Sequence, residues 1–154
     1  MRLIVKILLV IVIVFIAIQF IPSTLNKSRQ GTSVDVSKTF NMPNKVQTVL
    51  INACYDCHSN NTHYPWYSKI QPVRWMMDTH VKEGKEEINF SEFSNYSTRN
   101  KISKLNGIAN SIKDNIMPLF SYKLMHKSAN LSESERNLIT NWALQTSDSL
   151  SVKN

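Results

Sequence analysis

The side chains best suited to chemistry lie in one five-residue motif. Both cysteines of the chain and a histidine occur in the order Cys54-Tyr55-Asp56-Cys57-His58. The pattern C-x-x-C-H is the attachment signature of c-type haem. Positions i, i+3 and i+4 of a helix share a face, so both thiols and the imidazole can point the same way. The thiols would then bond to the two haem vinyl groups, and His58 would bind the iron as proximal ligand.

Three other chemistries use cysteine pairs. A thioredoxin-like dithiol has the same C-x-x-C spacing but needs a βαβ context, and this sequence shows no strand-like alternation. A structural zinc site needs four ligands, and the motif with His63 would be an unusually local set. A plain disulfide or two free thiols is the remaining alternative. The apolar segment ahead of the motif and the cysteine count of two favour haem c.

That apolar segment, at the start of the chain, predicts a membrane anchor. Residues 3–21 contain only two polar side chains, Lys6 and Gln19. As a helix they would extend about 28 Å, close to the ~30 Å hydrocarbon core of a bilayer. No small-residue cleavage pattern and no cysteine follow the segment. We therefore expect an uncleaved anchor in preference to a cleaved signal peptide, a lipoprotein anchor or a buried soluble helix.

The basic residues leave the orientation of this anchor nearly tied. Arg2 and Lys6 precede the apolar segment, and Lys27, Arg29 and Lys38 follow it. The positive-inside count is therefore almost equal on the two sides. Haem c is attached on the outer side of the bacterial inner membrane. We accordingly expect the N-terminus inside and the chain from about residue 23 outside, facing the periplasm.

Composition narrows the function classes. Residues 1–21 hold 18 apolar side chains, which leaves the rest of the chain poor in apolar residues for an independent core. A covalently bound haem would add apolar volume there. Three glycines in the whole chain exclude the glycine-rich phosphate loops of nucleotide-binding enzymes. The net charge of +7 comes from scattered lysines, which favour a solvated basic surface or one that steers an acidic redox partner. The expected location excludes nucleic acid.

The spacing of apolar residues predicts an all-α fold. Four segments have a helical apolar stripe: residues 45–57, 72–84, 102–116 and a last helix that begins at the capping box Ser132 and Glu135. Gly84 is expected to end the second helix, and Met117-Pro118 the third. Residues 58–67 are expected to form a loop, and residues 89–96 a short helix or turn.

We divide the chain into four parts on this basis. These are an anchor (1–21), a linker (22–44), a haem-binding domain (45–146) and a C-terminal tail (147–154). The haem-binding domain is expected to be a small cytochrome c-like unit of four or five short helices around one covalent haem.

Longer stretches around the motif carry a family resemblance. They are Cys54–Thr62 (C-Y-D-C-H-S-N-N-T), Tyr64–Ser68 (Y-P-W-Y-S), Gln71–Val73, His80-Val81, Glu83-Gly84, Asn89–Phe93 (N-F-S-E-F), Met117-Pro118, Tyr122, His126, Leu131-Ser132, Glu135-Arg136 and Trp142. From about residue 46 to 143 the chain resembles the haem-binding domain family of bacterial cytochrome c-like proteins. The P-W-Y-S and N-F-S-E stretches are more specific than the haem motif alone. The resemblance implies an anchored monohaem domain outside the inner membrane.

The second axial ligand of a c-type haem is usually a methionine or histidine. The candidates are Met42, His63, Met76, Met77, His80, Met117, Met125 and His126. Met117 is our choice, because it lies at a helix end directly before Pro118 and resembles the methionine-proline ligand segment of class I cytochromes c. Its alternative role is a core methionine.

Other candidates for the sixth position remain open. His80 is the first, although it lies on a stripe of apolar residues and could be a core histidine. His126 is the second, although it could instead cap a helix C-terminus. A vacant sixth position is the third. We expect Tyr64, Trp66 and Tyr67 to pack against the haem or to hydrogen-bond a propionate.

The expected function is electron transfer without enzymatic activity. The iron would be held by His58 and Met117, and the partners would be membrane-bound redox proteins, with an acidic docking surface, and the lipid bilayer. The alternatives are a haem peroxidase or gas and redox sensor with an open sixth site, and a haem-free dithiol oxidoreductase.

Overall fold

The computed structural model describes residues 2–28 and 34–152, and these residues form a helical fold without β-strands. In chain order the elements are α1 (Arg2–Gln19), α2 (Val36–Thr39), α3 (Asn44–Ala53), α4 (Tyr55–His58), η1 (Trp66–Lys69), α5 (Val73–Glu87), η2 (Phe90–Asn95), α6 (Thr98–Lys113), α7 (Phe120–Met125), η3 (Lys127–Ala129) and α8 (Glu133–Ser151). The all-α prediction is confirmed. Residues 29–33 of the expected linker and 153–154 of the expected tail lie outside the described residues.

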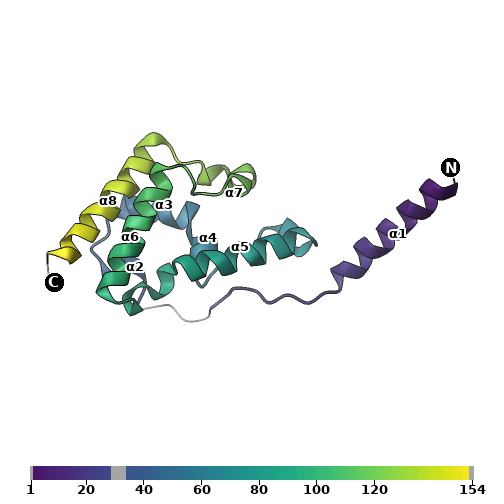
Figure 1. The fold of residues 1–154 in the computed structure, drawn as a ribbon, viewed down its shortest axis with the longest axis horizontal. Helices are drawn as coiled ribbons and strands as arrows, with labels where there is room; N and C mark the ends of the chain where they lie inside the picture. Colours follow the sequence, from purple (N-terminus) through teal and green to yellow (C-terminus); the bar gives the residue numbers. More distant parts are fainter. Residues whose placement is uncertain (1, 29–33, 153–154) are drawn as a thin grey trace.

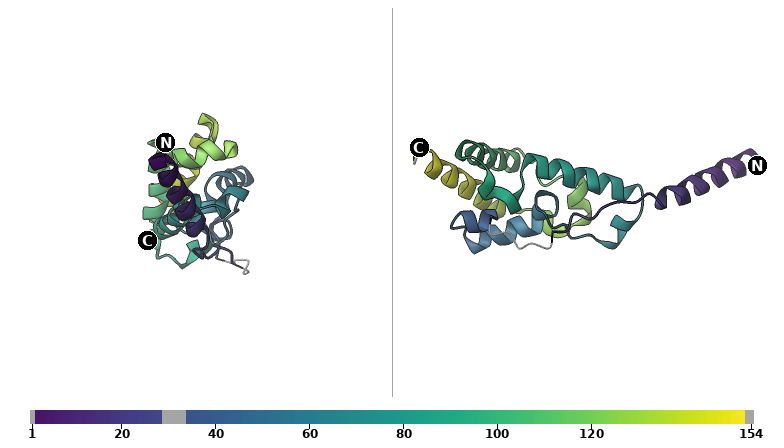
Figure 2. Two further views of the ribbon diagram at one scale, coloured as in Figure 1. Left: turned by 90° about the vertical axis from the view of Figure 1, so that its right-hand side faces the viewer. Right: turned by 90° about the horizontal axis from the view of Figure 1, so that it is seen from below.

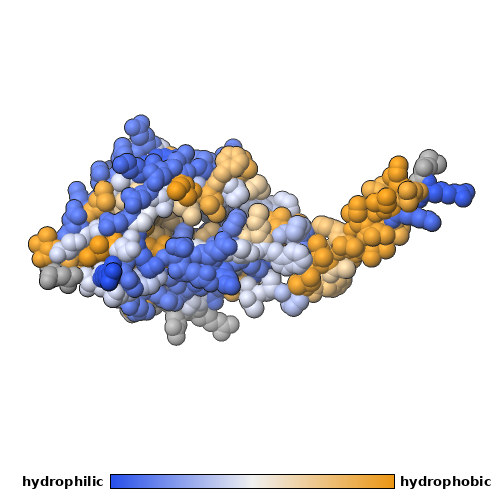
Figure 3. Space-filling model, viewed as in Figure 1, coloured by the Kyte–Doolittle hydropathy of each residue, from blue (hydrophilic) through white to orange (hydrophobic). Residues whose placement is uncertain are grey.

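Helix α1 stands apart from the rest of the molecule, which we call the body. It projects from one end of the body in Figure 1 and in the right-hand view of Figure 2. None of its residues is buried, and its length and apolar composition are sufficient to cross a membrane. In Figure 3 it is hydrophobic along most of its length, whereas the visible face of the body is mainly hydrophilic.

The hydrophobic core of the body lies between α3, α6 and α8 (Figure 1). The apolar stripes predicted from the sequence supply it. Its buried members include Val46, Val49, Leu50 and Ala53 of α3, Leu105 and Ile112 of α6, and Ile139 and Trp142 of α8. Ile116, expected on the α6 face, lies beyond the helix end and is exposed.

The start of α8 follows the predicted capping box. The Ser132 side chain accepts a hydrogen bond from the Glu135 N–H, and the Glu135 carboxylate accepts one from the Ser132 N–H. These reciprocal bonds satisfy N–H groups that have no partner within the helix. The cap therefore fixes where α8 begins.

Part of the segment expected to be a linker belongs to the core. Asp35 caps the four-residue helix α2, and Val36 at its start is fully buried. Asp35 also accepts a hydrogen bond from the Tyr55 hydroxyl (3.0 Å), which ties α2 to the haem motif. A helix this short has no apolar periodicity to detect.

Two helices extend further than the sequence indicated. The prediction that Gly84 ends a helix is wrong, since α5 continues to Glu87. The described part of the expected tail, 147–152, continues α8 as far as Ser151, and Ser147 is buried.

Candidate functional site

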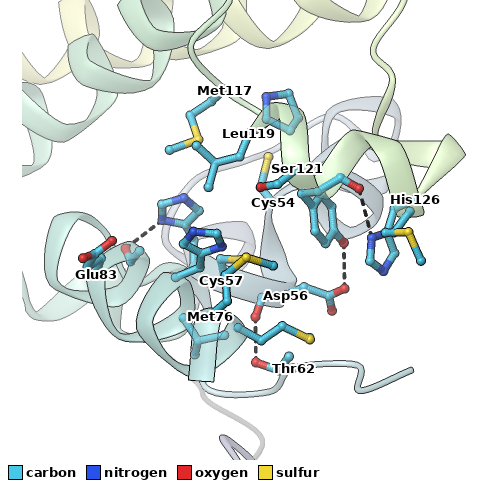
Figure 4. Close-up of a pocket in the computed structure, with 18 of the residues that line it drawn as sticks. Cys54, Asp56, Cys57, Thr62, Met76, Glu83, Met117, Leu119, Ser121 and His126 are labelled. Carbon is cyan, nitrogen blue, oxygen red and sulfur yellow. Dashed lines mark hydrogen bonds between the residues drawn. The ribbon is translucent and has the colours of Figure 1, made fainter. Parts of the chain in front are cut away.

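A cavity of about 610 Å³ opens in the body between α4, α5 and the segment 117–126 (Figure 4). Its volume is within the ~300–1,000 Å³ range of cofactor sites in proteins. The haem motif contributes Cys54, Cys57 and His58 to the wall, and Met117 lines it as well. The structure therefore brings all four predicted site residues to one cavity.

The motif lies on a short helix rather than at the end of a long one. A continuous helix over residues 45–57 is the wrong prediction, because α3 ends at Ala53 and Cys54 has non-helical backbone angles. The Cys54 carbonyl still accepts hydrogen bonds from the N–H groups of Cys57 (3.2 Å) and His58 (3.0 Å). This single turn retains the i, i+3, i+4 relation and keeps the three side chains on the cavity.

The His58 ring is held in one orientation by the end of α5. Its Nδ1 donates to the Gly84 carbonyl (2.7 Å) and lies 3.2 Å from the Ile88 carbonyl. Carbonyl oxygens only accept hydrogen bonds, so Nδ1 carries the proton and Nε2 keeps its lone pair. Burial lowers the pKa of His58, although both hydrogen bonds oppose this effect, so the ring is neutral near pH 7. A neutral imidazole fixed through Nδ1 suits binding of iron through Nε2.

Gly84 allows α5 to approach the haem motif closely. A β-carbon at this position would lie 2.8 Å from the Cys57 carbonyl oxygen, closer than real β-carbons come. Any larger residue would push α5 away from α4. The glycine is therefore required for the close approach that brings its own carbonyl to His58.

Both cysteines are free thiols, and both are half-buried at the cavity wall. Burial, with a smaller contribution from the neighbouring Cys57, raises the pKa of Cys54 to about 12. Burial and the Asp56 charge raise the pKa of Cys57 to about 11. Dithiol exchange requires an accessible thiolate with a lowered pKa. The raised pKa values are the opposite of what a dithiol oxidoreductase needs.

The wall opposite the motif comes from the chain that follows α6. In Figure 4, Met117 and Leu119 lie across the cavity from Cys57 and Met76. The Met117 thioether can therefore face a planar prosthetic group that is bound by the motif. Among the described residues the cavity also includes other candidate ligands: Met76, Met77, His80, Met125 and His126. Met42 is instead buried in the core, and His63 lies outside this cavity.

A network that sequence reasoning missed forms one side of the cavity. The Tyr122 hydroxyl donates to the Asp56 carboxylate (2.7 Å), and the Tyr122 ring stacks on His126 with 4.0 Å between centroids. His126 Nδ1 donates to the Tyr122 carbonyl (3.1 Å), so Nε2 accepts from the Tyr67 hydroxyl (3.3 Å). Both ring nitrogens of His126 are thus engaged, which argues against iron ligation by this residue.

The Asp56–Tyr122 bond also keeps the tyrosine protonated. Burial, followed by this hydrogen bond, raises the pKa of Tyr122. No sequence pattern joins two residues 66 positions apart. Only the family stretches, which include both residues, could have indicated that they belong to one site.

The three aromatic residues expected to surround the haem occupy different places. Tyr67 lines the cavity. Tyr64 does not, and the Arg74 guanidinium lies over its ring at 4.7 Å. Trp66 is 74% exposed on the surface of the body. Only Tyr67 is therefore placed to contact a ligand in the cavity.

The cavity can be tested against the prosthetic group that its residues imply. It offers two thiols at the attachment spacing, a neutral imidazole with a free Nε2, a facing thioether and apolar walls. This donor set suits a haem, which takes histidine and methionine as axial ligands.

Comparison with known proteins points to the same group. No curated protein and no solved structure matches the chain. The family model described as a haem-binding domain matches residues 13–145, most of the sequence. The matched region contains α3 to α7, which build the cavity. The chain therefore belongs to the haem-binding domain family.

Proposed function

We propose that this chain is a membrane-anchored, monohaem c-type cytochrome that transfers electrons outside the bacterial inner membrane. The observation that carries the proposal is the meeting of Cys54, Cys57 and a correctly oriented His58 in one cavity. Haem binding itself follows from the family. Covalent attachment and electron transfer are the proposed additions.

Each site residue has a distinct role in this function. Cys54 and Cys57 would hold the haem as thioethers, His58 would bind the iron through Nε2, and Met117 would be the second axial ligand. The bound haem supplies a one-electron Fe(II)/Fe(III) couple. The mainly apolar walls would limit the contact of the haem with water, and the Gly84 carbonyl keeps the His58 ring in place. Methionine ligation would favour a higher potential than two histidines.

The location follows from α1 together with the haem chemistry. The helix is long and apolar enough to span a bilayer. Haem c is attached outside the inner membrane, so the proposed covalent attachment supports a body on that side. A protein held in this way would meet membrane-bound redox partners by diffusion in two dimensions.

An open sixth position is the second candidate, and one observation favours it. His80 lines the cavity, and its ring makes no hydrogen bond to any other described residue. A free imidazole near a vacant iron position would suit a sensor or peroxidase. The dithiol alternative has no such support, because both thiols have raised pKa values.

Haem extraction tests the attachment. The full chain is expressed in a host that matures c-type cytochromes, then denatured and extracted with acidified organic solvent. We expect the haem to remain with the polypeptide, and to become extractable in the Cys54→Ala/Cys57→Ala variant. Complete extraction from the unaltered chain would overturn covalent attachment while leaving haem binding intact.

A methionine series tests the sixth ligand. Met117→Ala should convert a low-spin visible spectrum to a high-spin one, because the iron loses one axial ligand. Met76→Ala is the matched control, since it removes another thioether from the same cavity. If Met117→Ala leaves the spectrum unchanged and His80→Ala alters it, His80 is the ligand. A high-spin spectrum in the unaltered chain would support the open-site candidate.

A further inference from the structure

The described residues that connect α1 to the body are bound to the body by hydrogen bonds. The Asn26 N–H donates to the Tyr64 hydroxyl (2.9 Å), and Arg74 Nη2 donates to the Thr24 carbonyl (2.8 Å). The Asn26 side-chain amide also donates to two oxygens of the loop after α4. Residues 24–28 therefore lie against the body as a bound strap.

A pair of hydrogen bonds joins the end of α1 directly to the start of α5. The Gln71 N–H donates to Gln19 Oε1 (3.0 Å), and Gln19 Nε2 donates to the Gln71 carbonyl (3.3 Å). Gln71 is itself buried, and its side chain accepts from the Trp75 N–H in the first turn of α5. The position of α1 is thus linked to the helix that forms one wall of the cavity.

Large apolar side chains are exposed around this junction. We call the following residues the juxtamembrane patch: Phe20, Ile21, Trp66, Ile70 and Trp75. Trp66 is 74% exposed and Trp75 is 41% exposed. In the sequence they lie on either side of Gln71, which is buried. Figure 1 and the right-hand view of Figure 2 show that η1 and the first turn of α5 are the part of the body nearest α1. The patch therefore lies where the apolar helix ends.

The chemistry of the patch fits a phospholipid headgroup region. Tryptophan is enriched at membrane–water interfaces, where its ring is buried and its N–H remains solvated. The sequence between Cys57 and Met77 contains no acidic residue, and Lys69 is exposed within η1. A lysine beside interfacial tryptophans can contact lipid phosphates, and no carboxylate in this stretch would repel them.

We propose that the juxtamembrane patch is buried in the headgroup region of the bilayer, so that the body is seated on the membrane surface. The inference rests on the span by α1 that forms part of the proposed function. It adds a second, peripheral contact to that span. The cavity then has a defined orientation relative to the bilayer, which a flexible linker could not provide.

Fluorine NMR on the full chain tests this contact. The haem-loaded protein is labelled with 5-fluorotryptophan, reduced, and inserted into phospholipid nanodiscs. Two probes are added separately: a lipid with a nitroxide in its headgroup, and a water-soluble gadolinium chelate. Trp66 and Trp75 signals, assigned with phenylalanine variants, should broaden with the lipid probe and resist the chelate. Trp142 is the internal control, because it is buried in the core and should respond to neither.

Two variants test whether the bonds between Gln19 and Gln71 hold the patch against the bilayer. Gln19→Ala removes both bonds to Gln71 and should raise the broadening of Trp66 and Trp75 by the chelate several-fold. Phe120→Ser is the control. Phe120 is almost as exposed as Trp66, but it lies on α7, which belongs to the opposite wall of the cavity. It should leave both signals unchanged.

The outcomes separate this proposal from the anchor. The chain could stay in the discs while Trp66 and Trp75 broaden only with the chelate. That result would overturn the contact between the patch and the headgroups and would leave the membrane anchor intact. A chain that fails to enter the discs overturns both. The visible spectrum, recorded on the same sample, reports haem attachment independently of either result.

Discussion

The body contains two halves that are stabilised in different ways. In the core half, α3, α6 and α8 bury apolar stripes against each other, and Leu105 and Ile139 are completely enclosed. In the cavity half, α4 and α7 bury no residue, and the buried residues of α5 are Arg74, Val81 and Gly84. The cavity half is instead arranged by hydrogen bonds around an apolar space.

This difference shows what a ligand must contribute to the fold. Apolar burial is the dominant favourable contribution to folding, and the cavity half has little of it. Its hydrogen bonds orient His58 and Asp56, but each adds only about 1 kcal/mol of net stability. A haem in the cavity would supply the missing apolar contacts. The core half needs no such addition.

Withholding haem should separate the two halves most strongly. In a host without c-type maturation, we expect amides of α4 and α5 to lose on the order of 4 kcal/mol of protection, because the ligand stabilises only the state that binds it. Amides of α6 and α8 should keep most of theirs. Hydrogen exchange measured by mass spectrometry on the haem-loaded and the haem-free protein gives the loss of protection in both halves. Equal losses in both halves would show that the body is one cooperative unit.

Two glycine substitutions sharpen the same comparison. Gly84→Ala places a β-carbon against the Cys57 carbonyl, so we expect about 1–3 kcal/mol of destabilisation and a disturbed visible spectrum. Gly107→Ala is the control, because nothing lies within 4 Å of its added carbon. Since alanine is the better helix former, it should stabilise α6 by about 0.5–1 kcal/mol and leave the spectrum unchanged. Thermal unfolding and absorption spectra check both, and an unperturbed Gly84→Ala protein would contradict the close approach.

The smallest expected effect concerns the start of α8. Hydrogen bonds from Ser132 lower the pKa of Glu135 in the folded state. The lowered value means that the carboxylate stabilises the fold above its ordinary pKa, and that this stability is lost as the pH falls through the lowered value. Because Glu135 remains accessible to solvent, the contribution to stability should be about 0.5 kcal/mol. Glu135→Gln should reduce the pH dependence of the melting temperature between pH 5 and 3 without changing the visible spectrum. A changed spectrum would mean that the core half is coupled to the cavity.

The core half could be predicted from the sequence to a greater extent than the cavity half. The stripe of Val46, Val49, Leu50 and Ala53 and the capping box at Ser132 follow from local spacing, and the structure confirms both. Local spacing also indicated the haem motif, because a single helical turn is sufficient to align its side chains. These features depend on neighbours within a few residues.

The remaining features depend on contacts between distant segments. The role of Gly84 follows from the Cys57 backbone, and the Tyr122 hydroxyl finds its partner in Asp56. Val36 is buried although it follows a segment without periodicity. One sequence contains no signal for such pairings. Gly84 was consequently interpreted as a helix end, when it is the point where two helices touch.

Under the proposed function, the length of α5 has a consequence for the choice of redox partners. This helix begins beside Gln71, which is bonded to the end of α1, and its last turn supplies the carbonyl that holds His58. Its 15 residues extend for about 22 Å along the helix axis. With the juxtamembrane patch in the headgroups, α5 would be a rigid spacer that sets the distance between the bilayer and His58. Partners would then be selected by the height of their own redox centres above the membrane, independently of any side chain on the docking surface.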